Sequence, residues 1–118
     1  MSVTGGLETI VDAYDCAPDK LRDSAVVRAL FEALIADLSL HPVAPPIVHE
    51  FPGEAGLTAV VVLSESHLTL HTFPELGLAT LNLYCCRARP RWPWSDRLAT
   101  HLGSKRVTVR EIERGATP

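Results

Sequence analysis

The chain has 118 residues, 47% of them hydrophobic and 21% charged, and a formal net charge of −3 at pH 7. This length holds one domain with one core, and the small acidic charge without a long basic tract argues against nucleic acid as a partner. No apolar run reaches the roughly 18 residues of a membrane span, and no signal peptide is evident, so the cytoplasm is the expected location.

The first half of the chain predicts a strand, a long helix and a second strand, in that order. Residues 8–14 hold a short apolar stretch typical of a strand. Residues 23–38 carry the strongest helical pattern, with apolar side chains at helical spacing after a capping Asp23 or Ser24. Three prolines then end the helix, and residues 47–51 follow as a short strand.

Strands dominate the second half. Valine-rich or alternating segments predict four of them, at residues 57–63, 67–72, 78–86 and 106–112. The first of these is expected to be a central, buried strand, and residues 73–77 a turn. Residues 94–102 form a second helix that ends at Gly103, and the tail 113–118 is expected to fray. This order predicts one domain, residues 1–118, of the α+β class: a two-layer sandwich with a mostly antiparallel sheet and two helices on one face.

The three cysteines, Cys16, Cys85 and Cys86, form a poor disulfide framework because the count is odd and two are adjacent. The chain has no CxxC pair, and its His and carboxylate residues do not cluster at ligand spacing. We therefore expect reduced thiols and no metal site.

The polar segment Ser64-Glu65-Ser66-His67 joins two predicted strands. Polar residues at a hairpin tip usually form only a turn. A serine side chain can, however, attack the carbonyl of the preceding residue and convert that peptide bond to an ester. Such a reaction needs local strain and nearby donors that polarise the carbonyl.

Residues 64–72, Ser-Glu-Ser-His-Leu-Thr-Leu-His-Thr, together with residues 74–77, Pro-Glu-Leu-Gly, resemble the small bacterial S-adenosylmethionine decarboxylases. Further matches are Tyr14-Asp15-Cys16, Phe51 with Gly56, and Cys86 twenty residues after Ser66. The resemblance covers most of residues 6–86 and is weaker in the C-terminal third.

The resemblance implies self-cleavage between Glu65 and Ser66 into a β chain, residues 1–65, and an α chain, residues 66–118. Ser66 would become a covalent pyruvoyl group, which accepts the electrons released when CO₂ leaves the substrate. The product would be the aminopropyl donor for spermidine synthesis. By the same resemblance Thr58 and His71 assist processing and Cys86 is the proton donor in decarboxylation. The implied substrate-binding residues are Phe51, Leu68, Phe73, Glu75 and Glu8.

Strand geometry adds a point about the site. Ser66 and His71 are about 16 Å apart on one extended strand, too far for direct proton transfer. A hairpin turning at 73–77 would place Ser66 near residues 84–86, beside Cys86, and a tight turn at Ser64-Glu65 would place Thr58 opposite His71. We therefore expect a homodimer in which each site takes one half from each subunit, as the resembling family also implies.

Three departures from the family pattern leave the substrate open. Phe73 stands where tryptophan or tyrosine is usual, residues 87–91 are Arg-Ala-Arg-Pro-Arg, and Glu8 stands where histidine is expected. A distal cation of ornithine or arginine could pair with Glu8. S-adenosylmethionine remains the leading substrate. The alternatives are a pyruvoyl-dependent ornithine or arginine decarboxylase, or an unprocessed regulatory paralogue that binds a partner.

Overall fold

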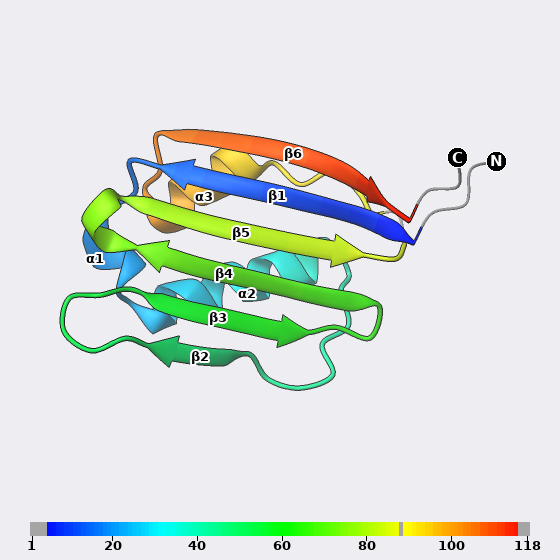
Figure 1. The fold of residues 1–118 in the computed structure, drawn as a ribbon, viewed down its shortest axis with the longest axis horizontal. Helices are drawn as coiled ribbons and strands as arrows, with labels where there is room; N and C mark the ends of the chain where they lie inside the picture. The colour runs from blue at the N-terminus through cyan, green and yellow to red at the C-terminus, as the bar shows by residue number, and fades with distance from the viewer. Residues whose placement is uncertain (1–4, 88, 116–118) are drawn as a thin grey trace.

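A six-stranded antiparallel sheet forms one layer of the computed structural model, and helices cover one of its faces (Figure 1). The structure describes residues 5–87 and 89–115. The strands are β1 (Gly6–Tyr14), β2 (Ile47–Glu50), β3 (Leu57–Val62), β4 (Ser66–Phe73), β5 (Leu78–Cys85) and β6 (Arg106–Arg114). The helices are α1 (Pro18–Leu21), α2 (Ser24–Asp37) and α3 (Trp94–Leu102), with a short 3₁₀ turn η1 (Pro74–Leu76). The predicted α+β sandwich is confirmed.

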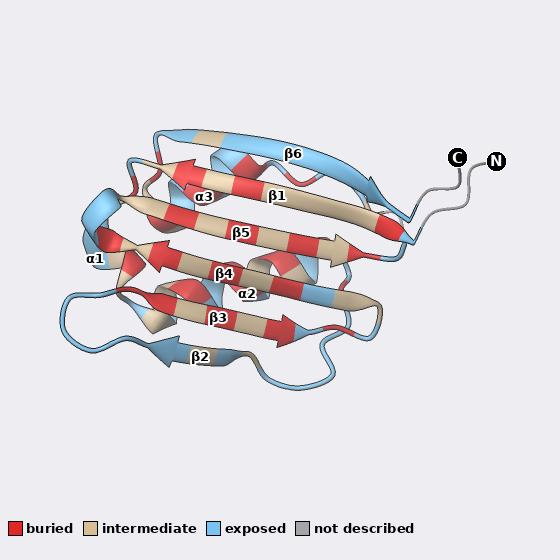
Figure 2. Cartoon of the chain, viewed as in Figure 1, coloured by how far each residue is buried: buried red, intermediate tan, exposed pale blue. Residues whose placement is uncertain are grey.

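The strand order across the sheet is β2-β3-β4-β5-β1-β6. The strands β2 to β5 follow one another as a meander, whereas the first strand of the chain lies between β5 and β6. The two edge strands, β2 and β6, are mostly exposed (Figure 2). The interior strands therefore carry the side chains that meet the helices.

One face of the sheet is covered and the other is open to solvent, which follows from the alternation along each strand. On β4 the buried side chains are Leu68, Leu70 and Thr72, and those between them point to the open face. Helix α2 covers the first set with Leu30, Phe31 and other apolar side chains at helical spacing. Asp23 caps that helix, since its side chain accepts a hydrogen bond from the main-chain N–H of Ala25 at 2.9 Å.

Three expectations from the sequence need correction. The strand β3 is next to the edge rather than central, and only its alternate residues are buried, so Val62 is 51% exposed. The helix layer contains α1 as well as the two predicted helices. The last strand runs to Arg114, so Glu113 and Arg114 are not part of a frayed tail, and residues 116–118 lie outside the described residues.

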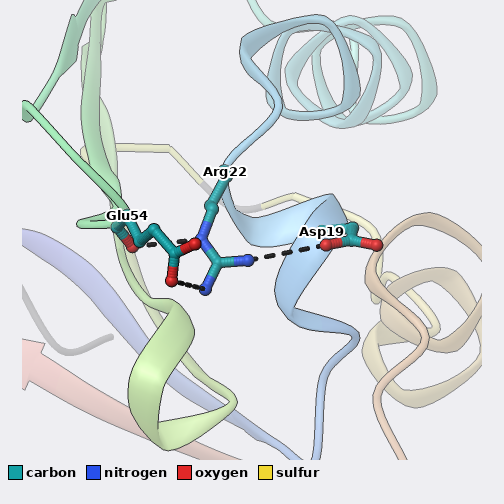
Figure 3. A network of polar contacts seen from close by, with 3 residues as sticks. All are labelled: Asp19, Arg22 and Glu54. Carbon is teal, nitrogen blue, oxygen red and sulfur yellow. Dashed lines mark hydrogen bonds and ion pairs between the residues drawn. The ribbon is translucent and has the colours of Figure 1, made fainter.

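Polar contacts fasten α1 to the sheet. Arg22, which follows α1, donates a hydrogen bond through Nε to the carbonyl oxygen of Glu54 at 3.0 Å and lies near the carboxylates of Glu54 and Asp19 (Figure 3). Thr72 on β4 is buried, and its hydroxyl makes two hydrogen bonds. It donates to the carbonyl oxygen of Leu21 at 2.7 Å and accepts from the N–H of Leu57 at 2.9 Å. Thr72 thus joins α1, β3 and β4 at one point.

Among the described residues, the three helices are too short or too polar for any one of them to cross a membrane.

Candidate active site

The β3–β4 hairpin closes on a two-residue turn made of Ser64 and Glu65. Leu63 and Ser66 flank this turn and exchange main-chain hydrogen bonds, from Leu63 N–H at 2.8 Å and from Ser66 N–H at 3.3 Å. This is the geometry of a tight antiparallel hairpin. The Glu65–Ser66 peptide bond therefore lies where the turn becomes strand β4.

Ser66 lies opposite Cys85 in the ladder between β4 and β5. Directly paired residues place their side chains on the same face with Cβ atoms about 4.5–5.5 Å apart. The Ser66 hydroxyl is buried and has no hydrogen-bond partner among the described residues. The predicted approach of Ser66 to residues 84–86 is confirmed, but its direct neighbour across the ladder is Cys85 rather than the expected Cys86, which comes one residue later.

The three cysteines are free thiols, and they differ in exposure. Cys16 lies in the core, and burial raises its pKa to about 11. Cys85 is also buried, which raises the pKa of its thiol, and the positive charge of Arg89 opposes this rise. Cys86 is exposed just beyond the end of β5. Within residues 5–87 and 89–115, no three His, Cys, Asp or Glu side chains gather closely enough to hold a metal ion.

A second polar cluster lies on the open face of the sheet, around His71 of β4. His71 is opposite Thr58 of β3, as expected from the hairpin, and Thr58 Oγ1 lies 2.6 Å from His71 Nδ1. The rings of Phe73 and Phe51 flank the imidazole, with centroids 4.4 Å and 5.8 Å away. The cluster is therefore a histidine in contact with a hydroxyl, flanked by two aromatic rings.

Ser66 and His71 of the same chain are separated in two ways. They are five residues apart on β4, which is roughly 16 Å along a strand. Because five is an odd number, their side chains also leave opposite faces of the sheet. Proton transfer needs heavy atoms about 2.6–3.2 Å apart, so these two groups do not react with one another in this conformation.

The other expected substrate-binding residues differ in their exposure to solvent. Glu75 is exposed in η1, near the end of β4 that carries Phe73. Leu68 is fully buried and packs in the core under the sheet. Its side chain therefore lies on the face of the sheet opposite His71 and does not reach the cluster around that residue.

Glu8 is already paired within the chain. One carboxylate oxygen lies 2.6 Å from Arg114 Nη1, and the other accepts a hydrogen bond from Asn82 Nδ2 at 2.5 Å. These contacts, that of Asn82 first, lower the pKa of Glu8. Glu8 therefore balances a cation of its own chain.

His41 and Arg89, which hold the side chain of Glu65, were not predicted from the sequence. Glu65 Oε1 accepts a hydrogen bond from the main-chain N–H of His41 at 3.1 Å and lies 3.0 Å from Arg89 Nη2. The only sequence signal for Arg89 was the run of basic residues after Cys86. The spacing of residues could not predict that this loop brings Arg89 back to the turn.

Known proteins resemble this chain over nearly its whole length. The family model described as S-adenosylmethionine decarboxylase matches residues 7–115. The S-adenosylmethionine decarboxylase proenzyme of Carboxydothermus hydrogenoformans is 36% identical over 113 residues, covering 93% of this chain and 86% of that protein. The proenzyme of Bacillus cytotoxicus is 41% identical over 116 residues, covering 95% and 85%. The crystal structure of the adenosylmethionine decarboxylase from Aquifex aeolicus superposes with a TM-score of 0.80 at 32% identity, covering 98% of this chain and 94% of that chain.

Proposed function

The chain belongs to the S-adenosylmethionine decarboxylase family, and we propose that it is a proenzyme that cleaves itself between Glu65 and Ser66 and then decarboxylates S-adenosylmethionine. The products of cleavage are a β chain, residues 1–65, and an α chain, residues 66–118, that begins with a pyruvoyl group. The observation that carries the proposal is the position of Ser66. Its buried hydroxyl has no partner among the described residues and follows directly on a tight turn.

Cleavage begins at the Ser66 hydroxyl. The oxygen attacks the carbonyl carbon of Glu65, the carbon–nitrogen bond breaks as the ester forms, and the proton passes to the Ser66 nitrogen. Loss of the Ser66 α-proton then expels the Glu65 carboxylate and leaves dehydroalanine. Hydrolysis releases ammonia and leaves the pyruvoyl group. An unpartnered hydroxyl is suited to this attack, because no hydrogen bond has to be given up first.

Once formed, a pyruvoyl group supplies a carbonyl that draws off the electrons of the bond to CO₂. The chain's own residues then move the protons. His71, oriented by Thr58, takes the α-proton during processing, and Cys86 returns a proton to the substrate α-carbon. A positioned acid or base contributes about 10²- to 10⁴-fold. The exposure of Cys86, against the burial of Cys85, favours Cys86 as the donor.

A homodimer of αβ protomers would complete the site. Ser66 lies opposite Cys85, one residue before Cys86, whereas His71 and Thr58 lie further along the sheet and on its other face. We therefore expect each half to need its complement from a second subunit. The open face also bears exposed apolar side chains, namely Phe51, Val62 and Ile112. Phe51 and Phe73 beside His71 would stack on the adenine, and Glu75 would hold the ribose.

Mixed dimers test the shared site. Ser66→Ala and His71→Ala chains should each be inactive alone. Co-expressed, about half of the dimers would be hybrids with one intact site of two, so activity should return to about a quarter of wild type. No return of activity in hybrids shown to form would refute sharing.

Mass spectrometry and a substrate comparison test the function itself. The wild-type protein should give two fragments that meet at residues 65 and 66, and Ser66→Ala should give one intact chain. A single intact wild-type chain would identify an unprocessed binding paralogue instead. CO₂ release should be fastest from S-adenosylmethionine, the aminopropyl donor for spermidine synthesis after decarboxylation, when measured beside ornithine and arginine. The pairing of Glu8 with Arg114 removes the feature that favoured a basic amino acid.

A further inference from the structure

The side chain of Glu65 is nearly buried, although Glu65 itself is part of the hairpin turn. Only 8% of this side chain is exposed. Hydrogen bonds from the Ser64 hydroxyl and then from His41 lower the pKa of Glu65, so the carboxylate is ionised at neutral pH. A buried, ionised carboxylate needs partners that fix its position.

One partner comes from the loop after α2. The N–H of Ser64 donates to the carbonyl oxygen of His41 at 2.8 Å, and the N–H of Val43 donates to that of Val62 at 3.0 Å. The main chain of this loop thus runs beside the turn, and the N–H of His41 reaches the Glu65 carboxylate at 3.1 Å. The turn is anchored along one side by main-chain contacts.

The other partner comes from the loop after β5. Arg89 Nη2 lies 3.0 Å from Glu65 Oε1, and the Arg89 side chain is only 18% exposed. The positive charge of Arg89 also opposes the rise in the pKa of the Cys85 thiol, and Cys85 is the residue opposite Ser66. The arginine therefore pairs with the residue before Ser66 and acts electrostatically on the residue across the sheet from it.

We propose that Arg89 is a positioning residue for self-cleavage, which acts by holding the Glu65 side chain so that the Glu65–Ser66 peptide is presented to the Ser66 hydroxyl. The inference rests on the proposed cleavage at that bond. The two ends of the scissile peptide are then set independently. The hairpin ladder fixes Ser66, and the Glu65–Arg89 pair fixes the residue whose carbonyl is attacked.

Two physical reasons make the pair important for the reaction. Removing one member of a buried ion pair leaves the other charge without compensation, so the remaining side chain moves toward water. Such a movement would turn the adjoining peptide, and a misplacement of about 1 Å can slow an intramolecular reaction about 100-fold. The effect should fall on the cleavage step, because Arg89 contacts neither His71 nor Thr58.

The rate of cleavage in freshly made chain is the direct test. Cell-free translation is stopped, and the loss of the 12.9 kDa precursor is followed by intact mass spectrometry in samples quenched in acid and denaturant. Arg89→Met should cleave about 10- to 100-fold more slowly than wild type, and Arg89→Lys should recover most of the rate, because it restores the charge. Arg91→Met, an exposed arginine of the same loop, is the matched control and should cleave at the wild-type rate.

A double-mutant cycle separates positioning from general loss of structure. Glu65→Gln should slow cleavage as Arg89→Met does, and the double variant should be no slower than either single one, since both remove the same pair. Wild-type cleavage of Arg89→Met, or effects that multiply in the double variant, would overturn the proposal. If Arg89→Met does not fold, Arg89→Gln, which also removes the charge, takes its place in the cycle with Glu65→Gln, and the same criterion decides. A wild-type chain that does not cleave at all refutes the proposed function rather than the role of Arg89.

Discussion

The contact between Thr58 and His71 leads to a quantitative prediction about processing. To remove a proton through Nε2, a neutral His71 must carry its own proton on Nδ1, which then donates to Thr58 Oγ1 over the observed 2.6 Å. Thr58→Val keeps the shape of the side chain and removes the acceptor. A hydrogen bond of this kind contributes about 1 kcal/mol, and each 1.36 kcal/mol is tenfold in rate, so elimination should slow about fivefold.

Two variants bracket this effect. Thr58→Ser keeps the hydroxyl and should process at nearly the wild-type rate. His71→Ala removes the base itself and should slow elimination about 10²- to 10⁴-fold. The order of rates should therefore be wild type, Thr58→Ser, Thr58→Val and His71→Ala.

Hydroxylamine trapping identifies the step that is slowed. Hydroxylamine cleaves an ester but leaves a peptide bond intact under mild conditions, so it splits only the chains that have reached the ester. Precursor of Thr58→Val and His71→Ala should accumulate in the hydroxylamine-sensitive form. If Thr58→Val processes as fast as wild type, or accumulates as hydroxylamine-resistant peptide, then the hydroxyl does not act through His71.

Three further outcomes follow from the buried groups and the thiols. Thr72→Val in an uncleaved Ser66→Ala background should lower the free energy of unfolding by roughly 2–4 kcal/mol, since it orphans two buried main-chain groups; urea denaturation measures this, and Thr72→Ser should lose much less. Iodoacetamide should modify Cys86 first under native conditions, and peptide mapping that finds a buried cysteine modified first would contradict the described exposure. Burial raises the pKa of Cys16 to about 11, so its contribution to stability is full below about pH 9 and is lost as the pH rises toward 11. Cys16→Ala should flatten the alkaline decline in stability, as measured by urea midpoints across that range.

Much of the fold could be predicted because its signals are local. The helix α2 has a capping residue and four turns of apolar spacing, and the register of β4 follows from the turns that precede and follow it. The helix α1 has only four residues, which is about one turn and too short for a periodic pattern. The position of β3 was misjudged because apolar side chains occupy both of its faces, and periodicity cannot separate a buried face from an open apolar one.

The candidate site divides in the same way. The meeting of Thr58 with His71 follows from strand pairing alone, and so does the separation of Ser66 from His71. The alternation that places His71 on the open face also places the Leu68 side chain in the core, and this could have been predicted from the sequence. The pairing of Glu65 with Arg89 could not have been predicted, because it depends on the path of a loop. Loops show no periodic pattern of apolar residues from which their path can be inferred.

The strand order gives the molecule a property that matters after processing. A break at Glu65–Ser66 would leave β1, β2 and β3 in one fragment and β4, β5 and β6 in the other. The β1 strand of the first fragment lies between β5 and β6 of the second, and β3 pairs with β4. The two fragments are interleaved in one sheet, so they could separate only by opening three ladders at once. Hydrogen bonding across the sheet can thus keep the protein whole without the covalent bond that the chemistry consumes.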